Sequence, residues 1–350
     1  MNGVLAGIED AAGVDLRRCE YFLGTSAGAI IAALLSAGRR PERPLQAGGG
    51  TPEQGAPALP SDSLGRIEGS FRQESADGAG GASSSAASET SSAREGVERA
   101  ARALARTVGA WALTASSPLA PLALRTGETP AALTRAALLR STPRGGAELL
   151  AVRALVEAAG ARFDGRLRVV AVDRASGRRV VFGRPGAPSA SVGAAVQASC
   201  AVPWLFAPVR IGGREYVDGG VWSPANLDAA PAGRGSQVLC LCPLTALGGV
   251  DANPLLTLGR AAMRTAVALE ELALRGRGAR VRMVFPDPAS AAAIGVDPMA
   301  AEPRARVLLA GYRQGMALVS GEGRRPQRRC QAPARQARPK APRPPGRSTV

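Results

Sequence analysis

The spacing of apolar residues changes repeatedly between helical and extended periods along the chain. Apolar positions recur every three or four residues in seven segments, which predicts helices at about 4–12, 29–37, 131–139, 147–159, 191–199, 255–274 and 304–318. Short apolar runs predict strands at about 20–23, 167–172, 179–182, 209–211, 215–217, 237–242 and 280–285. Residues 173–177 and the Gly212-Gly213 pair between these runs predict hairpin turns.

The alternation of strands and helices predicts an α/β domain with a largely parallel central sheet. The apolar run at 21–38 has nearly the length of a membrane span, but its internal Gly-rich turn divides it into a short strand and a helix. The first residues lack the basic start and cleavage pattern of a signal peptide. We therefore expect a cytoplasmic protein without a transmembrane helix.

Two segments depart from this pattern and set the expected domain limits. Of the 50 residues at 46–95, 31 are Gly, Ala, Ser or Pro, which predicts a flexible insertion within a domain at 1–321. A helical stripe resumes near residue 94. Residues 322–350 hold nine basic residues, one acidic residue and six prolines, which predicts a disordered basic tail. Charge alone would let it contact an anionic membrane, although a solvated appendage is the simpler reading.

The composition narrows the chemistry that this chain can perform. It has a net charge of +16 and no histidine, which excludes a Ser-His-Asp triad, a His-ligated zinc and a histidine base. The one lysine, Lys340, lies in the tail, so a carboxylate, tyrosine or thiolate is left to act as a base. The five cysteines match neither a disulfide framework nor a metal site, and Cys240 and Cys242 read as small core residues.

The strongest candidate for a nucleophile is Ser26, in the segment Gly24-Thr25-Ser26-Ala27-Gly28. This G-x-S-x-G pattern lies between a predicted strand and a predicted helix, where a sharp turn presents the serine hydroxyl. Gly24 and Gly28 would let neighbouring backbone approach closely, and the helix would direct free N–H groups, including that of Ala27, at the site. An ordinary Gly-rich turn between strand and helix is the alternative.

The candidate base is Asp218, which ends a predicted strand and precedes Gly219 and Gly220. A carboxylate at the end of a strand, with open backbone around it, could reach the serine directly. An aspartate that only caps the N–H groups of its own turn explains the Asp-Gly sequence equally well. These residues alone leave both readings open.

The two motifs, together with 198–209 and Ser223-Pro224-Ala225-Asn226, make the chain resemble the patatin-like phospholipases. The resemblance implies a three-layer α/β/α fold and a Ser-Asp dyad, with Ser26 as nucleophile and Asp218 as base. It implies cleavage of acyl esters of lipids through an acyl-enzyme, with no metal or organic cofactor. It also implies an oxyanion hole that includes Ala27, near the motif glycines Gly24, Gly28, Gly219 and Gly220.

One departure from the family pattern concerns the oxyanion loop. In the family a strand and a Gly-rich loop precede the first helix, whereas residues 3–8 here already read as that helix. Losing one oxyanion donor typically costs about 2.7–4 kcal/mol of transition-state stabilisation. The domain is thus expected to be N-terminally truncated. A start placed too far downstream is favoured over a truly shortened chain because both dyad motifs are intact.

Three functions follow from these patterns. The first is a lipid acyl hydrolase. Some apolar residues of 110–124 and 203–206 would then line a channel for the acyl chain, although most of them are expected to pack in the core. The second is a catalytically impaired lipid- or membrane-binding protein on the same scaffold. The third, nucleic-acid binding by the tail, is weaker because the tail has no aromatic residue on which bases could stack, and no specific nucleic acid is expected.

Overall fold

A computed structural model describes residues 1–44, 130–243, 254–294 and 304–321. The expected insertion at 46–95, the helical stripe that follows it, the apolar segment 110–124 and the tail at 322–350 lie outside the described residues. The elements are α1 (Asn2–Ala12), β1 (Phe22–Thr25), α2 (Ala27–Ser36), α6 (Pro130–Ser141), α7 (Leu150–Ala158), β2 (Leu167–Asp173), β3 (Arg179–Phe182), α8 (Val192–Cys200), β4 (Val209–Ile211), β5 (Arg214–Asp218), β6 (Gln237–Leu241), α9 (Pro254–Gly276), β7 (Arg280–Val284), α10 (Pro288–Ile294) and α11 (Arg304–Ser320).

The expected α/β class is confirmed, but the expected largely parallel sheet is wrong. In the larger sheet β1 pairs with β2 in parallel, whereas the β2–β3, β2–β5 and β4–β5 pairs are antiparallel. The reason lies in the two predicted hairpins. Their turns are too short for a crossover, so the strands they join must run in opposite directions. Gly212 and Gly213, both at positive φ, form the tighter of these turns.

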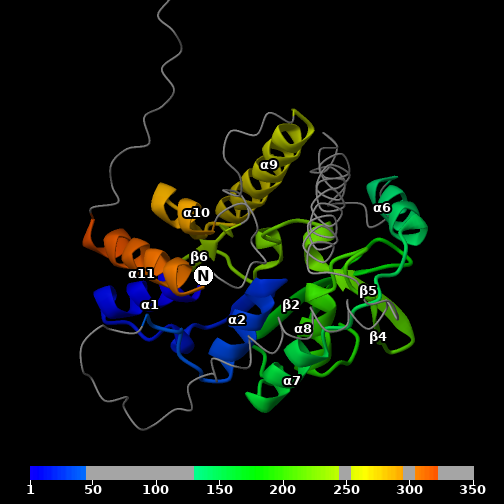
Figure 1. The fold of residues 1–350 in the computed structure, drawn as a ribbon, viewed down its shortest axis with the longest axis horizontal. Coiled ribbons are helices and arrows are strands. Elements are labelled where there is room, and N and C mark those ends of the chain that lie inside the picture. The colour runs from blue at the N-terminus through cyan, green and yellow to red at the C-terminus, as the bar shows by residue number, and fades with distance from the viewer. Residues whose placement is uncertain (45–129, 244–253, 295–303, 322–350) are drawn as a thin grey trace, which may run out of the picture.

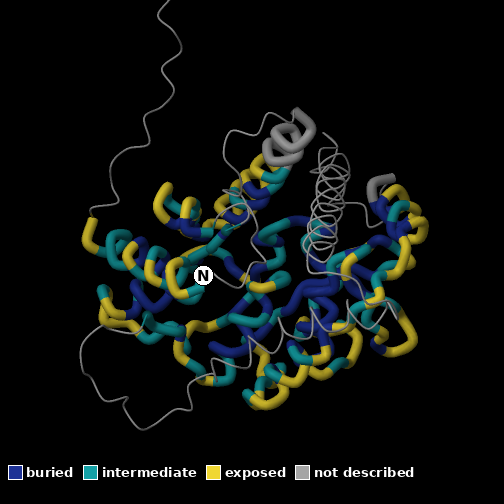
Figure 2. Tube along the Cα trace, in the orientation of Figure 1, coloured by how far each residue is buried: buried dark blue, intermediate teal, exposed yellow. Residues whose placement is uncertain are grey.

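Helices cover the larger sheet on the face where Val169 and Ala171 of β2 point. On this face α2, α7 and α8 form the main apolar core, and every residue of α8 is buried (Figures 1 and 2). On the other face Val172 and Val217 pack with Leu139 of α6. Because β2 is buried on both faces, its sequence reads as a continuous apolar run.

A second, two-stranded sheet consists of β6 and β7, which run parallel. Val238 and Val281 of this sheet pack with Leu274 of α9, and Leu23 of β1 joins the same cluster. This contact ties the small sheet to the larger one. Cys240 is partly buried in that cluster and its thiol lies 3.6 Å from the buried Cys242 thiol, as expected of core residues.

Helices α1 and α11 lie side by side and approach each other at backbone distance (Figure 1). A Cβ added at Gly7 would lie 2.2 Å from the Tyr312 carbonyl oxygen, and one at Gly315 would lie 2.3 Å from that of Val4. The glycines are therefore required by close packing rather than by turns. Among the helices of the described residues, none combines the length and the apolarity needed to cross a bilayer.

Candidate active site

The register of three strands brings Ser26 and Asp218 together. At Val170 β2 pairs with both β1 and β3, and at Ala171 it pairs with both β5 and β3. Since β3 occupies one edge of β2, β1 and β5 must share the other edge. They enter it from opposite directions, with Thr25 opposite Val170 and Asp218 opposite Ala171. The carboxyl ends of β1 and β5 therefore meet head to head.

Ser26 is the first residue after β1 and lies directly before α2. Its φ of 53° and ψ of −130° are unusual for a residue with a side chain. The turn is tight because a Cβ at Gly24 would lie 2.4 Å from the Ala29 Cα. Gly28 is different, since a Cβ there would meet no described atom within 4 Å. The expectation that both glycines permit close backbone approach is therefore right for Gly24 and wrong for Gly28 in the described structure.

Asp218 is buried at the end of β5, and its carboxyl group has two partners. Its Oδ1 accepts the Gly220 N–H at 2.7 Å, and the Ser26 hydroxyl lies close enough to the carboxyl group to favour its ionised form. Burial raises the pKa of Asp218 to about 6, although both contacts act to lower it. Asp218 thus caps its own turn and also contacts Ser26, so the two readings of the sequence are not exclusive.

Ser199 of α8 is a further polar residue of the site, to which the sequence assigned no role. Its hydroxyl accepts the Ser26 N–H at 3.0 Å and donates to the Val170 carbonyl at 2.6 Å. The side chain is fully buried. It ties the turn after β1 to the middle of β2. The available signal was a polar residue in a mostly apolar helix, a signal that Gln197 of the same helix shares.

The backbone N–H groups near Ser26 differ in their availability. Ala27 is exposed at the first position of α2, where a helix N–H has no internal acceptor. The Gly220 N–H is already bonded to Asp218. Gly219 has a steric role, because a Cβ there would lie 2.4 Å from the Val170 carbonyl oxygen. The Ala27 N–H is thus a donor that an oxyanion beside Ser26 could use.

The segment after α8 begins beside the end of β5, because the Asp218 N–H bonds to the Ala201 carbonyl. Phe206 is buried in the main core, as expected for most residues of 203–206, whereas Leu205 is exposed. Trp204 has a φ of +69°.

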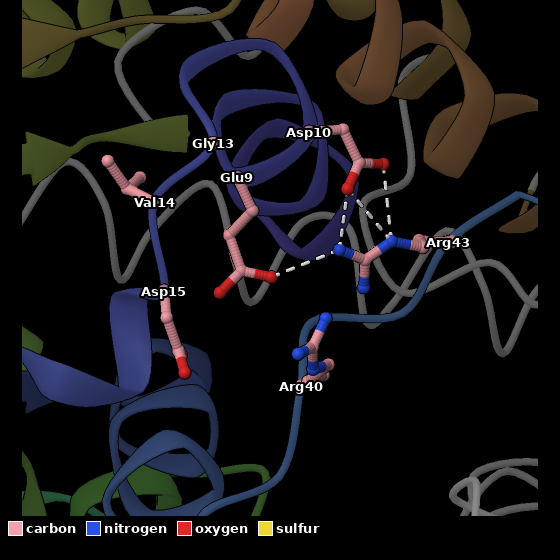
Figure 3. Close-up of a pocket in the computed structure, with 7 residues that line it drawn as sticks. All are labelled: Glu9, Asp10, Gly13, Val14, Asp15, Arg40 and Arg43. Atoms are coloured by element: carbon pink, nitrogen blue, oxygen red, sulfur yellow. Dashed lines mark hydrogen bonds and ion pairs between the residues drawn. The ribbon is translucent and has the colours of Figure 1, made fainter. Parts of the chain in front are cut away.

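A polar pocket of about 350 Å³ opens at the end of α1, and neither Ser26 nor Asp218 lines it (Figure 3). Figure 3 shows Arg43 between two acidic side chains, where it bonds to Asp10 at 2.6 Å and Glu9 at 3.2 Å. These pairs join the segment after α2 to α1. The pocket therefore reads as an ion-paired junction and not as the site of the chemistry.

Comparison with known proteins agrees with this geometry. A family model described as patatin-like phospholipase matches residues 78–231, a range that includes Asp218 and Ser199 but not Ser26. No curated protein matches the chain. The matched range covers less than half of the chain, and Ser26 is joined to it in space by the hydrogen bond from its N–H to Ser199. Residues 78–231 are thus similar to the patatin-like phospholipases.

Proposed function

We propose that this protein is a serine lipid acyl hydrolase in which Ser26 is the nucleophile and Asp218 the general base. The observation that carries the proposal is the strand register, which brings Ser26 and the buried Asp218 carboxyl group side by side at the ends of β1 and β5. The chain has no histidine that could act between them. With a pKa of about 6, Asp218 is mostly ionised at neutral pH and yet more basic than an exposed aspartate.

Acylation begins when the Ser26 Oγ attacks the ester carbonyl carbon and its proton passes to Asp218. The tetrahedral intermediate carries its negative charge on the former carbonyl oxygen, where the Ala27 N–H and the positive end of α2 stabilise it. The intermediate collapses by breaking the bond to the leaving alcohol, which takes the proton from Asp218. The acyl group remains on Ser26.

Deacylation repeats these steps with water. Asp218 accepts a proton from a water molecule as its oxygen attacks the acyl carbon. When the bond to Ser26 breaks, the proton returns to the Ser26 Oγ and a carboxylic acid leaves. No step requires a metal ion or an organic cofactor. The family supports a lipid ester as substrate, and the exposed Leu205 supplies an apolar surface for it.

A fluorophosphonate probe tests the proposal on the full chain. We expect covalent labelling at Ser26, identified by mass spectrometry of the labelled peptide, and its loss in Ser26→Ala. The second candidate is a catalytically impaired lipid-binding protein, favoured because the Gly220 N–H is already bonded to Asp218 and cannot serve an oxyanion. That candidate predicts liposome binding without labelling, and an unlabelled wild-type chain would overturn the hydrolase proposal in its favour.

A further inference from the structure

Asn226 is a fully buried amide in the segment that follows Asp218. Its Nδ2 lies 3.1 Å from the Thr25 Oγ1, 3.1 Å from the Gly219 carbonyl oxygen and 2.6 Å from the Ser223 carbonyl oxygen. Thr25 directly precedes Ser26, and Gly219 directly follows Asp218. One amide group therefore contacts both strand ends that meet at the candidate site.

The contact that the Asn226 Oδ1 makes determines which way the amide group is turned. Arg179 donates to the Asn226 Oδ1 at 3.3 Å, and a guanidinium group has no acceptor to offer. A reversed amide would direct its NH₂ at Arg179 and its oxygen at the carbonyls of Gly219 and Ser223. Asn226 also has a φ of +51°, a conformation that asparagine adopts more readily than most residues. The site therefore favours asparagine by both donor pattern and backbone.

The segment that carries Asn226 is anchored independently of β1 and β5. The Leu227 N–H donates to Glu270 of α9 at 2.9 Å. Asp228 forms a two-point ion pair with Arg179 of β3, with N–O distances of 2.6 and 2.7 Å. Asn226 is thus a fixed point against which the ends of the two strands can be positioned.

We propose that Asn226 is a positioning residue of the dyad, because its amide joins Thr25 to Gly219 and so keeps Ser26 and Asp218 beside each other. This role rests on the proposed function. Asn226 touches neither reacting group, and it acts through the residues adjacent to them. The contacts of the NH₂ group with the Gly219 and Ser223 carbonyls could also serve only to hold the 219–226 loop together. The bond to Thr25 separates the two explanations, since it alone reaches the strand of the nucleophile.

The experiment measures the rate of fluorophosphonate labelling of the full chain as a function of probe concentration. Thr25→Val removes the Oγ1 acceptor and keeps the shape, whereas Thr25→Ser keeps the acceptor. Asn226→Asp keeps the size and removes the donor. Gln314→Glu is the matched control, because Gln314 is also a buried amide and donates to the Phe285 carbonyl at 2.6 Å on α11, away from the dyad.

We expect Thr25→Val and Asn226→Asp to lower the limiting labelling rate on the order of 10–100-fold, with the half-saturating probe concentration nearly unchanged. Thr25→Ser and Gln314→Glu should label near the wild-type rate. Rescue by serine identifies the hydroxyl, and not merely a folded loop, as the required group.

The proposal is overturned if Thr25→Val labels at the wild-type rate, or if Thr25→Ser is as slow as Thr25→Val. Comparison of Thr25→Val with Thr25→Ser tests the proposal even if Asn226→Asp fails to fold. A wild-type chain that does not label at all is a different result. It refutes the proposed function, and the positioning role falls with it.

Discussion

Thr25 and Asp218 occupy successive positions along one edge of β2, opposite Val170 and Ala171. The two strands that end there come from opposite directions and are separated by almost 200 residues in the sequence. A one-residue slip of β1 against β2 would turn its side chains to the other face and move Ser26 away from Asp218. The candidate site therefore depends on strand register as much as on the identity of its residues.

Alanine substitutions of the two glycines that flank Ser26 should have different effects on the free energy of unfolding. Gly24→Ala should destabilise the protein by about 1–3 kcal/mol or more and reduce labelling of Ser26, because its Cβ would lie 2.4 Å from the Ala29 Cα. Gly28→Ala should be tolerated or slightly stabilising, since alanine favours a helix and the added Cβ meets no described atom. Thermal unfolding measured alongside labelling compares them, and equal effects of both changes would refute the assigned geometry.

The free energy of unfolding should fall as the pH rises and Asp218 becomes ionised in the folded protein. Burial raises the pKa of its carboxyl group from 3.8 to about 6. Between about pH 4 and pH 6 the carboxyl group is therefore protonated in the folded state but ionised in the unfolded state. Stability contributed by the neutral form is present below about pH 4 and is lost as the pH rises through about 6. Asp218→Asn, which cannot ionise, should therefore be more stable than wild type at pH 8 by up to about 3 kcal/mol.

Asp173 is a control for this measurement, because its pKa is shifted in the opposite direction to that of Asp218. Burial tends to raise its pKa, but the hydrogen bonds from Ser176 and Arg214 outweigh that effect and the pKa is lowered. Asp173→Asn should therefore destabilise the protein at neutral pH. Urea unfolding at pH 4.5 and pH 8 measures both variants. A gain for Asp218→Asn that does not shrink at the lower pH would contradict the burial argument.

Ser199 should matter for both stability and chemistry. Ser199→Ala leaves the Ser26 N–H and the Val170 carbonyl without this partner, which should cost about 1–3 kcal/mol and slow the labelling of Ser26. Ser290→Ala in α10 is the matched control. The Ser290 hydroxyl is also buried but has no hydrogen-bond partner in the described part of the chain, so its loss should be neutral. Comparable losses in denaturant unfolding would speak against a role for the Ser199 contacts.

The apolar pattern predicted most described elements to within two residues. The run that became β2 was found because burial on both faces leaves few polar positions in such a strand, whereas β3 and β7 were found from their short Val-containing runs. α10 was missed, since a seven-residue Ala-rich segment after a proline shows too little periodicity to be seen. The relative direction of the strands was predicted wrongly because the prediction relied on the alternation of strands and helices. The two hairpins, which the sequence did indicate, require antiparallel strands.

Of the candidate site, the sequence predicted the two residue types and their local turns but not how the turns meet. Ser26 and Asp218 were chosen from short motifs, and their contact arises from the register of β1 and β5 on β2. The contact of Asn226 with Thr25 spans 201 residues, and that of Ser199 with Ser26 spans 173. No local pattern encodes such pairs, because they depend on which strands become neighbours in the folded chain.

The measurement that most directly tests direct deprotonation of Ser26 by Asp218 is the pH dependence of fluorophosphonate labelling. The base acts only when ionised, so the wild-type rate should rise through a single transition near pH 6 and level off above pH 7. Asp218→Asn should label slower by orders of magnitude and lack that transition. A wild-type rate that stays flat across pH 6, or an Asp218→Asn rate equal to wild type, would contradict the dyad.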